Sequence, residues 1–140
     1  MCLFDATEIK LEKDLTVYKV LTVINGKLCS PYYTDFNWEI DKTYEIKKDK
    51  PDIRHNTVPS RFYPLKTIKY IEIEGDAFHT FRTIDDAKIF CENCSGVLFN
   101  DFRLVIYECV IPKSSKFVYT DRVGLQYASE KLKLVKEITF

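Results

Sequence analysis

The chain of 140 residues is poor in the residues that many binding loops and catalytic motifs need, with four glycines, two histidines and one tryptophan. A loop that cradles a phosphate with its backbone N–H groups depends on closely spaced glycines, and the sequence contains no such loop. It also lacks the nucleophile elbow of α/β-hydrolases and the paired histidines of zinc proteases. These absences argue against a nucleotide-binding protein and against two large classes of hydrolase.

Charge and hydropathy exclude further classes of protein. Twenty-one basic residues balance twenty-one acidic ones, and because nucleic-acid binders usually carry a basic face, we expect no nucleic-acid partner. No apolar run approaches the roughly 20 residues that cross a bilayer, and no basic segment followed by an apolar one opens the chain. Five cysteines, an odd number, suit reduced thiols. We therefore expect a cytoplasmic protein that does not enter a membrane.

Residues that build a core are abundant, since 46% of the chain is apolar and it holds ten phenylalanines and nine tyrosines. This length and composition predict one folded domain over residues 1–140. Two continuous apolar runs, 15–24 and 102–112, predict central strands, and Asn25-Gly26 predicts a hairpin turn. In total we expect about six to seven strands. The others lie at 37–48 (two strands around a turn at Asp41-Lys42), 67–75, 115–120 and 131–138; for residues 125–138 a helix is the alternative.

One helix is predicted over residues 83–93. Thr83 is a good N-cap residue, Asp85 and Asp86 favour the positive end of the helix dipole, and Ser95-Gly96 would end the helix. The section 47–66 contains three prolines and predicts a long surface connection. The fold class is therefore α+β, a mostly antiparallel sheet with one main helix packed on it.

Cys91 and Cys94 form a C-x-x-C pair at the C-terminal end of that helix. Structural zinc commonly uses two such pairs, and the other cysteines and histidines are isolated in the sequence. A redox pair sits at a helix N-terminus, where the dipole lowers the thiol pKa, whereas this pair falls at the C-terminal end. Packing is therefore favoured over metal or redox chemistry, and we expect no metal and no cofactor.

The segment FHTFRT, residues 78–83, most resembles a binding site. In a strand, His79 and Phe81 share one face while Phe78 and Thr80 share the other. His79 would line a corner close to Arg82 and the helix start, where backbone N–H groups and a guanidinium suit an anion. The alternative is a histidine that bonds a backbone carbonyl and has a structural role.

Lys19 lies within the otherwise apolar run 15–24, next to Tyr18. One interpretation places both in a ligand site with His79 and Arg82. In the other, Lys19 reaches solvent at a sheet edge or pairs with a carboxylate such as Glu108 or Glu130.

Cys2 raises the alternative of an enzyme. If Met1 is removed, Cys2 carries a thiol and a free amine together, as in N-terminal-nucleophile hydrolases. Such a site also needs an oxyanion hole, for which the sequence shows no signature.

Several motifs spread over nearly the whole chain resemble an uncharacterised family of small bacterial and phage proteins. They are the opening Met1-Cys2-Leu3, VYKVL, SPYY followed by an aromatic-Trp-Glu stretch, FHTFRTIDDAK, a strand ending in IPK, and YASEKLKL. The resemblance implies a single cytosolic domain linked to phages or other mobile elements, and it implies no activity.

A weaker similarity is to the ADP-ribosyltransferase fold, which also begins with a strand bearing a key basic residue. This similarity would put Lys19 where those enzymes place Arg or His, and Glu130 near their catalytic acid. The sequence departs from that pattern, because lysine replaces the usual residue and no Ser-Thr-Ser motif is present. It is a hint about topology.

The sequence favours a non-enzymatic binding module for a protein partner or a small anionic ligand. Its site would be built from Tyr18, Lys19, His79 and Arg82, with the proline-rich section around Arg54, His55 and Arg61 beside them. The alternative is an enzyme, either a hydrolase using Cys2 or a degenerate ribosyltransferase-like protein.

Overall fold

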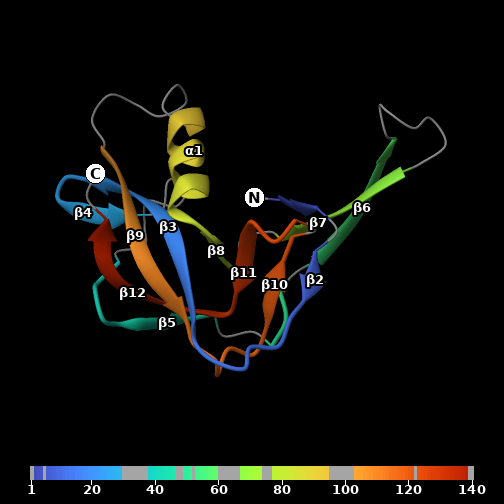
Figure 1. Cartoon of the computed structure of the whole chain (residues 1–140), viewed down its shortest axis with the longest axis horizontal. Helices are drawn as coiled ribbons and strands as arrows, with labels where there is room; N and C mark the ends of the chain where they lie inside the picture. The colour runs from blue at the N-terminus through green and yellow to red at the C-terminus, as the bar shows by residue number, and fades with distance from the viewer. Residues whose placement is uncertain are drawn as a thin grey trace.

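The computed structural model describes residues 2–4, 6–29, 38–46, 49–51, 53–59, 67–73, 77–94, 103–121 and 123–138, with the backbone alone for 2–4, 53–59, 67–73 and 94. Within these ranges the fold is α+β, with one helix and mostly antiparallel strands (Figure 1). The elements in chain order are β1 (Cys2–Phe4), β2 (Thr7–Glu8), β3 (Leu15–Ile24), β4 (Lys27–Cys29), β5 (Thr43–Glu45), β6 (Ile53–Pro59), β7 (Thr67–Ile73), β8 (Phe78–Phe81), α1 (Ile84–Cys94), β9 (Arg103–Ile111), β10 (Val118–Thr120), β11 (Gln126–Ser129) and β12 (Lys131–Ile138).

The described strands form two sheets. Nine strands make the larger sheet in the order β2-β10-β11-β8-β3-β9-β12-β5, with β4 paired to β3 beside this path, while β1, β7 and β6 make a smaller one. The longest ladder joins β3 to β9, from Leu15 opposite Ile111 to Val23 opposite Arg103. In Figure 1 the hairpin of β6 and β7 extends to the side, away from α1. The centre of the larger sheet is therefore the pair of strands that the two continuous apolar runs predicted.

β3 has two different neighbours on the edge opposite β9. β8 pairs with β3 at Tyr18, which lies opposite Phe81, and β4 pairs with it from Thr22 to Ile24. Residues 19–21 have no ladder partner on this edge among the described strands, because β8 continues beside β11 instead. We call this opening between the strands the β3–β8 fork, and it is where Lys19 lies.

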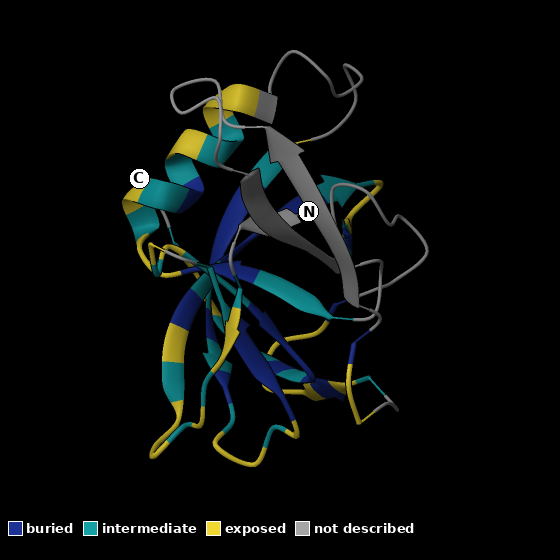
Figure 2. Cartoon of the chain, turned by 90° about the vertical axis from the view of Figure 1, so that its right-hand side faces the viewer, coloured by how far each residue is buried: buried dark blue, intermediate teal, exposed yellow. Residues whose placement is uncertain are grey.

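Both faces of the central strands are covered. On one face α1 packs through Ala87 against Val20, Phe81 and Ile106. The other face carries the largest buried cluster, in which side chains of β3, β9 and β12 pack against Trp38 and Tyr44. Figure 2 shows the buried segments concentrated along these strands, with the outer surface of α1 exposed. This two-sided burial explains why the two runs are apolar at successive positions.

Local sequence explains the hairpin and the helix start. Asn25 and Gly26 have φ values of 51° and 77°, the left-handed pair that a two-residue hairpin turn requires and that Asn-Gly adopts readily. At α1, the Asp86 N–H donates to Thr83 Oγ1 at 3.1 Å and the Thr83 hydroxyl donates to Asp86 Oδ2 at 2.6 Å. The predicted N-cap at Thr83 is confirmed, and the predicted helix 83–93 is α1; Ser95-Gly96 lie outside the described residues.

Most predicted strands are confirmed, namely 15–24, 67–75, 102–112, 115–120 and 131–138, so the strand alternative is correct for 131–138. Around Asp41, whose φ is 65°, the expected turn is present and β5 follows it. The strand expected before this turn is not formed at residues 38–40, where Ile40 makes only an isolated bridge to Leu134. Strands outnumber the expected six to seven, because short polar segments such as Gln126–Ser129 also join the larger sheet. No helix in the described part of the chain is long and apolar enough to cross a membrane.

The prediction for the proline-containing section is wrong. The section 47–66 was expected to be a surface connection, but residues 53–59 form β6 and pair with β7 from Ile53 opposite Ile73 to Pro59 opposite Thr67. Proline is tolerated at the end of a strand, where no ladder hydrogen bond is lost. Pro59 ends β6 and Pro51 precedes it, so these two prolines flank the strand and do not interrupt it.

Candidate functional site

The structure divides the predicted ligand-binding residues into separate environments. Tyr18 and Lys19 are successive residues of β3, so their side chains point to opposite faces of the sheet. Tyr18 packs beside the cluster under α1, whereas Lys19 shares its face with Val17 and Leu21. Lys19 and His79 meet at the β3–β8 fork, and Arg82 lies exposed at the start of α1.

Lys19 is buried, with 8% of its surface exposed. Its Nζ donates a hydrogen bond of 2.9 Å to the backbone carbonyl of His79, across the fork where β8 leaves β3. The ammonium also lies 5.8 Å from the centre of the Trp38 ring, which stacks edge-on against Tyr44 and Phe78. A carbonyl oxygen and an aromatic face both carry partial negative charge, and both stabilise a cation.

Burial lowers the pKa of Lys19 from 10.5 to about 8, partly opposed by the nearby Cys109. The expectation that Lys19 pairs with Glu108 or Glu130 is wrong, as is the expectation that it reaches solvent. Glu108 lies opposite Tyr18 on the α1 face, and among the described residues no carboxylate forms an ion pair with Lys19. Lys19 is therefore a buried cation whose observed partners are neutral.

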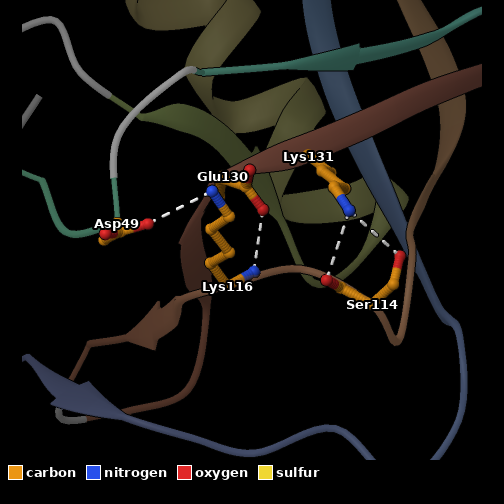
Figure 3. Close-up of polar contacts among 5 residues, drawn as sticks. All are labelled: Asp49, Ser114, Lys116, Glu130 and Lys131. Carbon is orange, nitrogen blue, oxygen red and sulfur yellow. Dashed lines mark hydrogen bonds and ion pairs between the residues drawn. The ribbon is translucent and has the colours of Figure 1, made fainter.

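Glu130 is also buried, with 1% of its surface exposed, but it has a structural role (Figure 3). Its Oε1 accepts a hydrogen bond from the backbone N–H of Lys116 at 2.7 Å. Its backbone N–H donates to Phe117 O, and its carbonyl accepts the N–H of Ile46. Around it, Lys116 pairs with Asp49 at 3.1 Å and Lys131 donates to Ser114. Glu130 thus ties the β11–β12 bend to the segments before β10 and after β5.

His79 is partly buried on the opposite face from Lys19. Burial, and secondly the charge of Lys19, lower its pKa to about 3. Its buried Nδ1 has no hydrogen-bond partner among the described residues, so the bond of the imidazole to a backbone carbonyl is not seen at this atom. His79 contributes its carbonyl to the fork, and its ring is neutral at physiological pH.

The sequence predicted that the start of α1 would bind an anion, but the structure does not favour an anion there. The Thr83 hydroxyl already accepts the N–H of Asp86, so one of the donors of the first turn is used. Asp85 and Asp86 place two carboxylates in that turn, where they repel a negatively charged ligand. The N-terminus of α1 therefore does not form an anion site with Arg82, whose other neighbours lie outside this helix.

Those neighbours belong to the turn between β10 and β11. Arg82 N–H donates to Leu125 O at 2.8 Å, and its guanidinium Nη1 lies 3.8 Å from the point where a Cβ on Gly124 would stand. Val123 is 66% exposed and Leu125 39% exposed. We call Arg82, Val123, Gly124 and Leu125 the turn corner.

Hydrogen bonds tie the described residues of the turn corner to Asp121. Asp121 Oδ1 accepts the N–H groups of Leu125 at 2.8 Å and Gln126 at 3.4 Å, and Asp121 O accepts the N–H of Gly124 at 3.2 Å. Gly124 has a φ of 71°, which glycine adopts without strain. The sequence assigned these residues no role, and the signal that was missed was a pair of apolar residues flanking the turn glycine.

The cysteines take structural places where they are described. Cys109 is fully buried in the largest cluster, and burial raises its pKa to about 12; Cys91 packs beside the cluster under α1. No group of three or more metal-ligating side chains is found within the described ranges. The side chains of Cys2, Arg54 and His55 lie outside the described part, as does Arg61, so their predicted roles stay predictions.

Comparisons with protein-family models, with curated proteins and with solved structures found no match to this chain. The resemblances to small phage proteins and to ribosyltransferases therefore stay predictions, and function has to be argued from the residues themselves.

Proposed function

We propose that this chain is a non-enzymatic binding module that recognises a protein partner through the turn corner. The observation that carries the proposal is the exposure of Val123 and Leu125 on a turn held by hydrogen bonds, with the Arg82 guanidinium beside them. A rigid loop loses little conformational entropy on binding, so its exposed apolar area contributes more fully to affinity.

The chemistry of the turn corner defines the partner. Arginine and apolar side chains are enriched at protein interfaces, and a guanidinium binds a carboxylate in two parallel hydrogen bonds. The partner should therefore present an apolar side chain next to an aspartate or glutamate. Arg82 would anchor that carboxylate while Val123 and Leu125 cover the apolar group.

The enzyme alternative has less support from the described contacts. Lys19 bonds the His79 carbonyl, whereas Glu130 bonds the N–H of Lys116 between other segments. Each group is engaged in holding the fold together, and a shared substrate would have to displace both bonds.

Photo-crosslinking in the cells that produce the protein tests the proposal. A photoreactive phenylalanine analogue replaces Val123 in one variant and Ile40 in a matched control, because Ile40 is 49% exposed but belongs to the β5 end of the sheet. We expect a discrete crosslinked adduct from position 123, none from position 40, and loss of the adduct when Arg82→Glu is added. Equal adducts at both positions, or no adduct at 123, would contradict the proposal.

A further inference from the structure

The β3–β8 fork gathers polar groups inside the largest cluster of the core. Lys19 and Thr80 each lie next to the one paired position of these strands, where Tyr18 lies opposite Phe81. Their side chains project from the same face, that of Val17 and Phe78. The Lys19 ammonium bonds the carbonyl of the peptide that leads into Thr80, so the two polar groups are neighbours.

Both groups have hydrogen bonds left to make. Lys19 Nζ carries three N–H donors and gives one to His79 O. Thr80 is fully buried, and its Oγ1 has no hydrogen-bond partner among the described residues. A buried hydroxyl without a partner is costly and is rare in folded proteins, which points to a further group bonded here.

Charge identifies what that group is. A buried ammonium is normally matched by a negative charge. Cys109 and Tyr107 face Lys19 from β9, but burial keeps the Cys109 thiol protonated with a pKa of about 12, and a tyrosine is neutral below pH 10. Glu108 lies on the other face, and Glu130 is bonded to Lys116 N–H. Among the described residues, the side chains that converge here therefore carry a positive charge or none.

We propose that the β3–β8 fork is a binding site for a small inorganic anion of the size of a halide, held by Lys19 Nζ and Thr80 Oγ1. The anion would neutralise the ammonium and accept a hydrogen bond from each of the two side chains. Its size is limited because Lys19 is only 8% exposed and Thr80 is fully buried. The proposal is independent of the turn corner, since Lys19 and Thr80 do not belong to it.

The only tryptophan of the chain gives a direct test, because Trp38 lies 5.8 Å from Lys19 Nζ and is itself buried. Iodide quenches tryptophan fluorescence on close approach, so iodide bound in the fork should quench Trp38. The titration uses sodium iodide at constant ionic strength, balanced with sodium gluconate, whose anion is larger than a halide. We expect quenching that saturates and that added chloride reverses by competition.

Variants assign the quenching to the fork. Lys19→Met should abolish the saturable component, and Thr80→Val, which keeps the shape of the side chain, should raise the half-saturating iodide concentration roughly tenfold through loss of one hydrogen bond to a charge. Lys42→Met is the matched control, because Lys42 lies 5.1 Å from the Tyr44 ring of the same aromatic stack but is 59% exposed. It should behave as the wild type.

Quenching that rises linearly without saturation in the wild type would overturn the proposal. The same conclusion follows if Thr80→Val and the wild type show equal saturable quenching, even where Lys19→Met fails to fold. As a second readout, chloride should raise the pKa of Lys19, because a bound anion favours the charged amine. A Lys19 pKa that is independent of chloride would also overturn the proposal.

Discussion

Lys19 illustrates how one side chain can replace part of a sheet ladder. It closes the opening between β3 and β8 with a single hydrogen bond to His79 O, at the cost of burying an ammonium. The sequence drew attention to Lys19 because a charge within an apolar run is unusual. Its partner could not be predicted, because a backbone carbonyl has no signature in the sequence and its position depends on how β8 diverges.

The lowered pKa of Lys19 predicts a pH-dependent difference between the wild type and Lys19→Met. Above pH 8 the folded protein releases this proton, whereas the unfolded chain holds it until about pH 10.5. Between these values the unfolded state binds more protons, so the wild type gains stability relative to the variant as pH rises, by on the order of 3 kcal/mol in total. Urea unfolding of both proteins at several pH values measures this difference.

Groups remote from Lys19 that titrate in this range contribute equally to both proteins and cancel in the difference. Lys42→Met, which removes an exposed lysine beside the same aromatic stack, serves as the matched control. A Lys19→Met difference that is flat between pH 8 and 10.5 would show that the ammonium is not buried.

The lowered pKa of His79 predicts that the protein loses stability in acid. Its pKa is about 3 in the folded protein and 6.5 in the unfolded chain. As pH falls below 6.5, the imidazole of the unfolded chain is protonated while that of the folded protein stays neutral. The free energy of unfolding therefore decreases by about 2 kcal/mol between pH 6.5 and 5. His79→Gln should lose this part of the acid sensitivity in urea unfolding, and equal pH dependence of the two proteins would refute the assignment.

At the scale of elements, α1 begins where its capping residues place it. Thr83→Ala removes the acceptor of the Asp86 N–H and should lower the free energy of unfolding by about 1 kcal/mol. Thr83→Ser keeps a hydroxyl and should lose a few tenths of that amount. Circular dichroism during urea unfolding measures both variants; a Ser variant as unstable as the Ala variant would mean that the hydroxyl is not the cap.

Elements with strong local signals were predictable, and those defined by pairing were not. Continuous apolar runs predicted β3 and β9. The Asn25-Gly26 dipeptide predicted the hairpin turn, and the N-cap at Thr83 predicted the start of α1. β11 consists of Gln126–Ser129, too short and polar to be identified alone, and it becomes a strand because β8 and β10 flank it. The same pairing creates the turn corner, so its grouping of Arg82 with Leu125 could not be predicted from the sequence.

At the scale of the whole molecule, Glu130 connects segments distant in the sequence. Its carboxylate and backbone join the β11–β12 bend to Lys116, Phe117 and Ile46. The surrounding pair of Lys116 with Asp49 is exposed and should matter little. The buried carboxylate is therefore the member of this group on which stability depends.

Glu130→Ala should destabilise the protein by roughly 3 kcal/mol, because it leaves the Lys116 N–H without its acceptor and opens a cavity. Glu130→Gln keeps an acceptor oxygen and should cost about 1 kcal/mol. Chemical denaturation compares them, with Lys116→Ala as a control that retains the backbone N–H. If Glu130→Ala proved as stable as the wild type, the carboxylate would have some role other than holding these segments.

The molecule thus separates two regions that the sequence suggested as one, a buried fork with Lys19 and the His79 carbonyl and an exposed turn corner with Arg82. Heteronuclear NMR titration of the Lys19 amine and the His79 imidazole tests this separation most directly. In buffer without halide, the structure predicts a Lys19 pKa of about 8 and a His79 ring that stays neutral down to about pH 3. Values near 10.5 and 6.5 would put both side chains in water and contradict the account.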